Sequence, residues 1–387
     1  MTDRAGPLDD LLIVDLSRVL AGPYATMVLA DLGARVVKVE RPLTGDDSRH
    51  IGPFKDGEPG QSAYFASINR GKESIALDLA DPTDRAVLDA LLARADVLVE
   101  NFRPGVMARL GLGWDALHAR HPRLVYAAAS GFGHTGPDAD KPAYDMIVQA
   151  MGGIMSVTGW PGGAPTRVGT SIGDIAAGLF TVAGILAALH DRARTGEGRF
   201  VDVAMLDGQV AILENAVARF AVSGVAPGPL GARHPSITPF AAYACAGGHV
   251  VVAAGNDSLF RALAAALGEP GLAADPRFAT NAARTDHAET LGAMIEARLA
   301  AHDASYWLAV FEAAGVPCGP LHDVRQALGH RQVRARNMAI QTAFPDGSPL
   351  LAAGNPVKIS GFADPPTRAK APALDEHRAM ILADLGL

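Results

Sequence analysis

The stretch LLIVDLSRVLAGPYATMVLADLGARVVKVE, residues 11–40, decides the fold class. Residues 11–14 form a short apolar run, which is typical of a buried strand. Residues 21–32 suit a helix that Gly33 ends, and residues 36–40 form a second apolar run. Two short strands joined by one helix predict a right-handed parallel βαβ unit.

The same alternation continues along the chain. Residues 74–79 predict a strand, 82–93 a helix and 97–100 another strand, and 124–129 is a further candidate strand. Strands that alternate with helices in this way are typical of a mostly parallel α/β sheet. The sequence therefore predicts an α/β domain in the first part of the chain.

The character of the chain changes after residue 175. Residues 175–190 and 204–222 predict two long helices, and the first is apolar on every face, so we expect it to be buried. The proline-rich segment 225–239 predicts a linker or an active-site loop. Residues 243–253 predict a β-hairpin that opens a second, smaller α+β domain. The helices of that domain are expected at 258–267 and 290–300.

Composition excludes several classes of protein. Of the 387 residues 49% are hydrophobic and 19% are charged, which excludes a disordered chain, and the net charge of -7 gives no broad face for nucleic acid. Cys245 and Cys318 have no CxxC spacing and suit a reducing compartment. The N-terminus is acidic, unlike a signal peptide, and the longest apolar run, 175–189, is too short for a membrane span. We expect a soluble, cytoplasmic protein that binds neither nucleic acid nor membrane.

Two generic motifs occur. Residues 131–136 fit GxGxxG, but Pro137 follows where a dinucleotide-binding chain would start a helix. Residues 169–173 fit the GxSxG of hydrolases, which makes Ser171 a candidate nucleophile, although no HGGG-type segment accompanies it. The twelve histidines show no ligand spacing, so no metal site is expected.

Two acidic residues allow two interpretations each. Asp174 precedes the apolar helix at capping-box distance from Ser171, so it is either a structural cap or a nucleophile that the positive helix end keeps ionised. Asp145, after the glycine-rich turn, is either a cap or a catalytic acid. Basic residues near turns belong either to a solvated surface or to a pocket for a polyanionic nucleotide at the strand ends. They are Arg18, Arg41, Lys72, Arg103, Arg109 and Lys141.

The chain resembles the family III CoA-transferases of CaiB/BaiF type, a group that includes formyl-CoA transferase, carnitine CoA-transferase and α-methylacyl-CoA racemase. The likeness covers essentially the whole chain, with many segments in the right order. These segments are RVLAGP (18–23), DLGA (31–34), VKVERP (37–42), VENFRPG (99–105), SGFG (130–133), Gly173-Asp174, GILAAL (184–189), TGEG (195–198) and GVPCGP (315–320).

The resemblance implies a CoA-transferase with acyl-CoA as substrate and no permanently bound cofactor. Asp174 would be the nucleophile, with Asp145 as a second catalytic residue, and the intermediates would be aspartyl anhydrides and an aspartyl-CoA thioester. Arg41 and Arg109 would face CoA phosphates. The positions implied to contact CoA are Leu20, Ala21, Arg41, Leu77, Ala80, Asn101, Phe102, Arg103, Arg109, Lys141 and Tyr144.

The resemblance also implies an interlocked homodimer with a large Rossmann-like domain built from both ends of the chain. The expected boundaries are 1–200 completed by 325–387 for this CoA-binding domain, 201–230 for a linker helix and loop, and 231–324 for the small α+β domain.

The sequence departs from two branches of the family. Tyr144 stands where the racemases have a catalytic histidine, and a phenol is a poor base at neutral pH. Residues 231–236 replace the glycine loop of formyl-CoA transferase, and Leu20 replaces its active-site glutamine. The succinyl-CoA:dicarboxylate branch is more similar, so we expect a succinyl-CoA donor and a short dicarboxylate acceptor.

The distal carboxylate of such an acceptor needs a cationic partner. Arg18 and Arg233 are candidates, and His234 lies beside the second of them. The alternatives that stay open are a racemase, a hydrolase that uses Ser171 and a CoA-binding protein without catalysis.

Overall fold

The computed structural model describes residues 6–58 and 60–387, so the first five residues of the acidic N-terminus lie outside the described part. The chain divides into two compact units. Unit 1 comprises Met1–Met155, Arg167–Val225 and Leu328–Leu387, and unit 2 comprises Ser156–Thr166 and Ala226–Ala327. Compared with the expected boundaries, unit 1 includes residues 201–225 of the expected linker, and unit 2 includes residues 156–166, 226–230 and 325–327.

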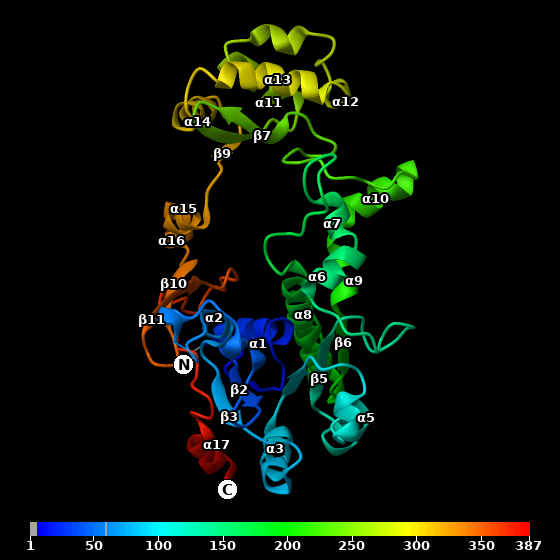
Figure 1. Cartoon of the computed structure of the whole chain (residues 1–387), viewed down its shortest axis with the longest axis vertical. Helices are drawn as coiled ribbons and strands as arrows, with labels where there is room; N and C mark the ends of the chain where they lie inside the picture. Colours follow the sequence, from blue (N-terminus) through cyan, green and yellow to red (C-terminus); the bar gives the residue numbers. More distant parts are fainter. Residues whose placement is uncertain (1–5, 59) are drawn as a thin grey trace. The chain divides into compact units, whose positions relative to one another are not determined.

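Unit 1 is built on a six-stranded parallel sheet in the order β3-β2-β1-β4-β5-β6 (Figure 1). The strands are β1 (Leu12–Asp15), β2 (Arg35–Glu40), β3 (Glu73–Ala76), β4 (Val97–Glu100), β5 (Val125–Ser130) and β6 (Phe200–Ala204). The predicted parallel α/β sheet is therefore confirmed. The strand order reverses between β1 and β4, which creates the crevice where open α/β sheets bind ligands.

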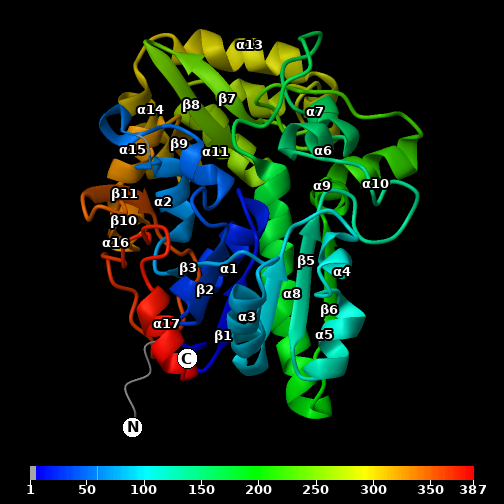
Figure 2. The same cartoon turned by 60° about the horizontal axis from the view of Figure 1, so that its bottom comes forward.

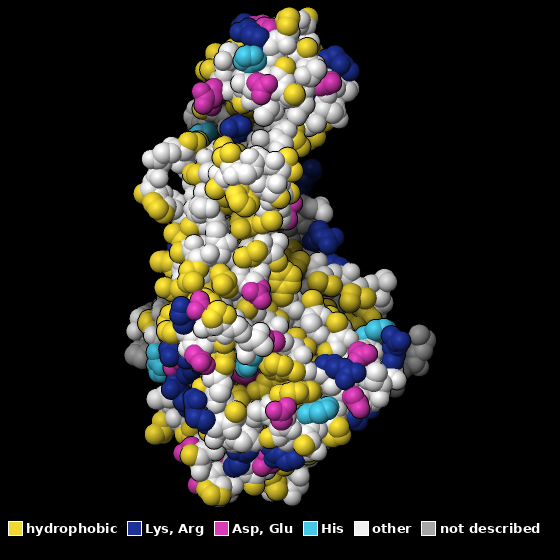
Figure 3. Space-filling view, turned by 90° about the vertical axis from the view of Figure 1, so that its right-hand side faces the viewer, with side chains coloured by type: hydrophobic (Ala, Val, Ile, Leu, Met, Phe, Trp, Pro, Cys, Tyr) yellow, Lys and Arg dark blue, Asp and Glu magenta, His cyan; other side chains and the backbone are white. Residues whose placement is uncertain are grey.

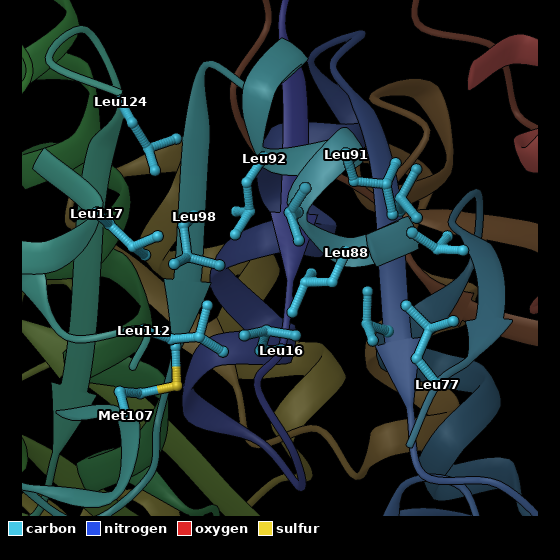
Figure 4. Close-up of a cluster of buried hydrophobic side chains, with 14 of the residues drawn as sticks. Leu16, Leu77, Leu88, Leu91, Leu92, Leu98, Met107, Leu112, Leu117 and Leu124 are labelled. Atoms are coloured by element: carbon cyan, nitrogen blue, oxygen red, sulfur yellow. The ribbon is translucent and has the colours of Figure 1, made fainter. Parts of the chain in front are cut away.

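Both faces of this sheet are buried, as the nearly continuous apolar strands require. Ile13 and Val97 point into a core shared with α1 (Ala21–Asp31) and α8 (Ile172–Thr195). Their neighbours Val14 and Leu98 point the opposite way, into a leucine-rich core under α3 (Pro82–Arg94). Figure 2 shows α3 against the sheet, and Figure 4 shows Leu98 in this core with Leu88 and Leu92 of α3.

Helix α8 packs closely on α1 at Gly178, where glycine is needed. A Cβ at this position would lie only 2.9 Å from the Ala21 carbonyl oxygen. With 24 residues it is long and apolar enough to cross a membrane, by length and composition only. Here it is a core helix, but this chain alone covers it only in part. Leu179, Phe180 and Leu186 are exposed on this chain.

The helix expected over 204–222 is divided at Leu213 into α9 (Met205–Ile212) and α10 (Glu214–Ser223). The C-terminal segment returns to unit 1, where the His377 amide donates to the Ser74 carbonyl at 3.0 Å. The other elements that lie wholly in unit 1 are α2 (Ala63–Asn69), α4 (Val106–Arg109), α5 (Trp114–Arg120), α6 (Asp145–Met151), α16 (Arg331–Ala335), β10 (Ala339–Ala343), β11 (Pro349–Ala353) and α17 (Arg378–Leu385).

Unit 2 contains an antiparallel sheet in the order β7-β8-β9, and its first two strands form the predicted hairpin. Its core is lined by Val250, Phe260, Leu291 and Phe311 among others. The elements are β7 (Phe240–Cys245), β8 (Gly248–Ala253), α11 (Asp257–Ala266), α12 (Asn281–Asp286), α13 (Ala288–Leu299), α14 (Ala304–Ala313) and β9 (Cys318–Pro320), while α7 (Ile154–Val157) and α15 (Val324–Gly329) lie at the unit boundaries.

Candidate active site

A pocket of about 220 Å³ lies at the carboxyl ends of β1, β4 and β5, beside the strand-order reversal. Asp174 is part of its wall. The other lining residues are Arg18, Val19, Leu20, Ala21, Asp47, Asn101, Phe102, Arg103, Pro104, Ala129, Ser130, Gly131, Ala139, Lys141, Pro142, Ala143, Tyr144 and Met205. The fold thus brings several separate segments, at residues 18–21, 47, 101–104, 129–144 and 205, around one carboxylate.

Asp174 lies in the first turn of α8, but it is not part of a capping box. The Ser171 side chain makes no cap hydrogen bond. Asp145, on the neighbouring helix α6, caps the start of α8 instead. Its carboxylate Oδ1 accepts a hydrogen bond from the Gly173 N–H at 2.8 Å. A Cβ at Gly173 would lie 2.7 Å from Val148, so the glycine of the Gly-Asp pair lets α6 and α8 approach. The capping interpretation of Asp174 is therefore wrong.

Asp145 is held from its own helix. Gln149, one turn later and fully buried, donates to Asp145 Oδ2 at 2.7 Å and accepts the Val168 N–H at 2.9 Å. The Arg167 guanidinium lies 3.6 Å from the same carboxylate oxygen. Sequence reasoning missed Gln149 and Arg167, although Gln149 stands at the i,i+4 spacing that places two side chains on one helix face.

The environment of Asp174 favours the protonated acid. Burial, followed by the negative charge of Asp145, raises the pKa of Asp174 to about 7. At neutral pH this group is therefore only partly ionised, whereas the positive helix end was expected to keep it ionised. Near neutral pH the ionised form is still accessible, and a carboxylate that lacks solvation is a reactive nucleophile.

Tyr64, on α2, is a further residue that sequence reasoning missed. Burial and the charges of Asp174, Asp46 and Asp145 raise its pKa to about 12. The phenol therefore remains a protonated hydrogen-bond donor near the carboxylates. Nothing in the sequence around Tyr64 marks it, because it comes to the site through the packing of α2.

Most of the predicted CoA contacts lie together. Leu20, Ala21, Asn101, Phe102, Arg103, Lys141 and Tyr144 line the same pocket as Asp174. Arg41 and Leu77 line a smaller neighbouring pocket of about 60 Å³, and Arg18 and Phe102 belong to both. Ala80 and Arg109 line neither of these two pockets.

The basic residues differ in their environment. The Arg18 guanidinium lies over the Phe102 ring and pairs with Asp47 at 2.9 Å, and Arg41 contacts the same carboxylate. Lys141 pairs with Asp138 at 2.7 Å. Lys72 fits neither interpretation offered for the basic set, because it is fully buried against Asp15, 3.1 Å away, on the inner side of α1. We therefore remove Lys72 from the candidate nucleotide contacts.

Other predicted residues are placed as follows. Arg233 and His234 belong to unit 2, where the His234 ring stacks on Phe240, so their substrate role stays a prediction. The GxGxxG segment follows β5 without a helix until Asp145. Among residues 6–58 and 60–387, no group of three or more potential metal ligands occurs.

The geometry thus defines a class of protein: a doubly wound α/β domain with a desolvated carboxylate and several cationic side chains around one pocket. Comparison with known proteins narrows the class. The family model for CoA-transferase family III matches residues 8–378. This chain belongs to the family III CoA-transferases, the CaiB/BaiF group, and is a CoA-transferase.

Individual relatives are similar over nearly the whole chain. An acetyl-CoA:oxalate CoA-transferase of Acetobacter aceti is 49% identical over 97% of this chain and 95% of its own. A succinate–glutarate CoA-transferase of Agrobacterium fabrum is 39% identical over 100% of this chain and 97% of its own. The crystal structure of a CaiB/BaiF family protein from Brucella suis matches with a TM-score of 0.86 and 40% identity, covering 98% of this chain and all of that one.

Proposed function

We propose that this CoA-transferase moves CoA from a short acyl-CoA to a short dicarboxylate, with Asp174 as the covalent nucleophile. The observation that carries the proposal is the position of Asp174. It is a carboxylate without a cationic partner among the described residues, in the pocket that the predicted CoA contacts line. The buried carboxylates Asp15 and Asp46, in contrast, pair with Lys72 and Lys38.

The proposed reaction balances in four steps. An ionised Asp174 oxygen attacks the donor thioester carbonyl, the C–S bond breaks, and CoA leaves as thiolate from a mixed anhydride. The thiolate attacks the aspartyl carbonyl of this anhydride and releases the donor acid. The acceptor carboxylate then attacks the aspartyl-CoA thioester and gives a second anhydride with free thiolate. Thiolate attack on its acyl carbonyl forms the new acyl-CoA and returns Asp174 as carboxylate. Water has to be excluded throughout, because each intermediate hydrolyses.

The acceptor is the finer part of the proposal. The relatives named above use oxalate in one case and glutarate or succinate in the other, and all three are dicarboxylates. Arg18 supports a dicarboxylate here, since its guanidinium lines the Asp174 pocket and could hold a distal carboxylate in a bidentate pair. The sequence favours a succinyl-CoA donor, whereas the relative at 49% identity uses acetyl-CoA.

The test is a donor–acceptor screen that follows CoA exchange by mass. Acetyl-CoA and succinyl-CoA are offered as donors, and oxalate, succinate, glutarate and butyrate as acceptors. Arg18→Met is expected to raise the KM for dicarboxylates steeply and to leave butyrate almost unchanged. Arg41→Met is the matched control, because Arg41 contacts the same Asp47 but lines the other pocket. Equal losses for both acceptor types, or faster transfer to butyrate in the wild type, would refute the dicarboxylate assignment.

We further propose that the protein acts as a homodimer. Helices of unit 1 expose large apolar side chains, and exposed apolar patches are typical of protein interfaces. Figure 3 shows hydrophobic side chains gathered on the face of unit 1 that is turned to the viewer. They include Met146, Ile147 and Met151 of α6, Leu179 and Phe180 of α8, and Val217, Phe220 and Val222 of α10. Sedimentation at nanomolar concentration is expected to show a dimer, and a folded monomer there would contradict the proposal.

A further inference from the structure

The loop between β1 and α1 contains a strained residue in the wall of the active site. Val19 has a φ of 64°, in the left-handed region that β-branched residues rarely adopt. It lines the Asp174 pocket between Arg18 and Leu20. Strain of this kind persists only where the surroundings hold it in place.

Side chains from three other parts of unit 1 hold the backbone on both sides of Val19. Asn101, directly after β4, accepts the Arg18 N–H and donates to the Arg18 carbonyl, both at 2.7 Å. Asp46 Oδ1 accepts the Val19 N–H at 3.1 Å. Lys38, on β2, donates to the Ser17 carbonyl at 2.8 Å. Consecutive backbone groups are thus fixed by side chains rather than by a regular element.

Asp46 is itself held firmly. It is buried, its Oδ2 lies 2.8 Å from the Lys38 ammonium group, and its Oδ1 also accepts from the Ser48 N–H and hydroxyl, each at 2.8 Å. One buried ion pair therefore holds both Ser17 and Val19. This arrangement leaves the loop little freedom, because any shift of Val19 would break a charge-assisted hydrogen bond in a dry environment.

We propose that Asp46 and Asn101 are positioning residues for CoA transfer, which hold Val19 in its left-handed conformation and thereby keep Leu20 and Ala21 in the wall beside Asp174. This inference rests on the proposed function. It also gives Asn101 a second role beside the predicted CoA contact, because its side-chain oxygen and nitrogen both bond the Arg18 backbone. Small displacements in such a wall misalign the thioester and the nucleophile, which costs rate more than binding.

The kinetic test uses Asp46→Asn, with Asn101→Ala as a second variant that leaves no buried charge unpaired. Each is expected to lower kcat by roughly 30-fold while the KM for acyl-CoA changes by less than about threefold. Ser48→Ala is the matched control, since Ser48 bonds the same carboxylate oxygen but does not touch the loop. It is expected to keep the wild-type kcat.

Rescue by glycine separates positioning from a general loss of structure. Glycine adopts positive φ without steric cost, so Val19→Gly in the Asp46→Asn background is expected to recover roughly tenfold in kcat. Relief of the strain at Val19 also raises stability, so kcat is compared per folded molecule, where a protein that is only less stable has no loss of kcat to recover. Wild-type kcat in both Asp46→Asn and Asn101→Ala, or no recovery on adding Val19→Gly, would overturn the proposal.

Hydrogen exchange gives a readout that does not depend on CoA chemistry. The Arg18 and Val19 amides are expected to exchange at least about tenfold faster in Asn101→Ala and Asp46→Asn, respectively, than in the wild type. Unchanged exchange would overturn the proposal even if kcat fell. Faster exchange in a protein whose wild type transfers no CoA would instead overturn the proposed function and the catalytic role of the loop together.

Discussion

Unit 1 contains two groups of buried carboxylates with opposite electrostatics. Burial opposes ionisation in both groups. Around β1 and β2 it is outweighed by cations: Lys72 and Lys38 hold the pKa of Asp15 low, and Lys38 does so for Asp46. The Asp174 and Glu100 carboxylates pair with no lysine or arginine among the described residues, and burial raises the pKa of each to about 7. The Asp145 charge adds to the effect on Asp174.

The same domain therefore uses buried carboxylates for two purposes. A buried carboxylate that meets lysine or arginine fixes the chain, as Asp46 fixes Val19. A buried carboxylate whose charged neighbour is another acid is destabilised in its ionised form, and this form is a reactive nucleophile. Three substitutions test this contrast: Asp174→Asn, Lys38→Met and Asp145→Asn.

The largest effect is expected from Asp174→Asn, which removes the nucleophile without changing its size. Turnover should fall by about 10⁴-fold or more, because the neighbouring carboxylate, Asp145, has both oxygens held by Gly173 and Gln149. The circular dichroism spectrum and CoA binding should stay as in the wild type. Asp191→Asn on the exposed part of the same helix is the control, and appreciable transfer by Asp174→Asn would refute the covalent mechanism.

The carboxylates that pair with lysine should matter for stability and not for chemistry. Lys38→Met leaves Asp46 buried without its partner, so urea unfolding should show a loss of roughly 3–5 kcal/mol in the free energy of unfolding. Asp174→Asn in the same assay should cost nothing. A Lys38→Met protein as stable as the wild type would remove the contrast between the two groups.

The pH dependence of stability follows from the sign of the Asp174 shift. Its folded-state pKa, about 7, lies above its unfolded value, so the folded state binds the proton more tightly. The contribution of Asp174 to the free energy of unfolding of the wild type should therefore fall as the pH rises from about 4 to about 7. Asp174→Asn lacks this contribution and should not show the fall. The variant should gain roughly 2 kcal/mol over the wild type between pH 5 and pH 8, measured by urea unfolding. A difference that does not vary with pH would contradict the raised pKa.

The smallest effect is expected from Asp145→Asn. Removing the second contributor to the Asp174 shift should lower the pH midpoint of acylation, while burial, the first contributor, keeps it above that of an ordinary aspartate. Arg167→Met is the matched control, because Arg167 faces the same carboxylate from 3.6 Å and its removal should not lower that midpoint. A midpoint that stays in place in Asp145→Asn would show that burial alone sets the pKa.

Much of the fold could be predicted because its signals are local. Uninterrupted apolar runs that alternate with helices, such as the helix at residues 82–93, are typical of a parallel sheet. Strands β1 to β5 are found where such runs occur. The division of 204–222 at Leu213 had no such signal, since neither glycine nor proline marks it. The exposure of Leu179 and Phe180 also could not be predicted, because an all-apolar helix gives no indication of which face the same chain covers.

The site was predictable as a set of residues but not as an electrostatic environment. Asp174 could be singled out from its place before an apolar helix and from the family resemblance. Its pKa depends on Asp145, which lies 29 positions earlier and reaches it only through the packing of α6 on α8. Lys72 shows the same limit, because a lysine near a turn gives no sign in sequence that Asp15 and the first turns of α1 enclose it.

The most direct test of the central claim is single-turnover formation of the aspartyl-CoA thioester as a function of pH. Enzyme is mixed with acyl-CoA, quenched, treated with borohydride and analysed by peptide mass. We expect modification at Asp174 alone, with a rate that rises as the pH increases through about 7 and the carboxyl group ionises. Modification of another residue, or a rate at Asp174 that is constant from pH 5 to pH 9, would contradict it.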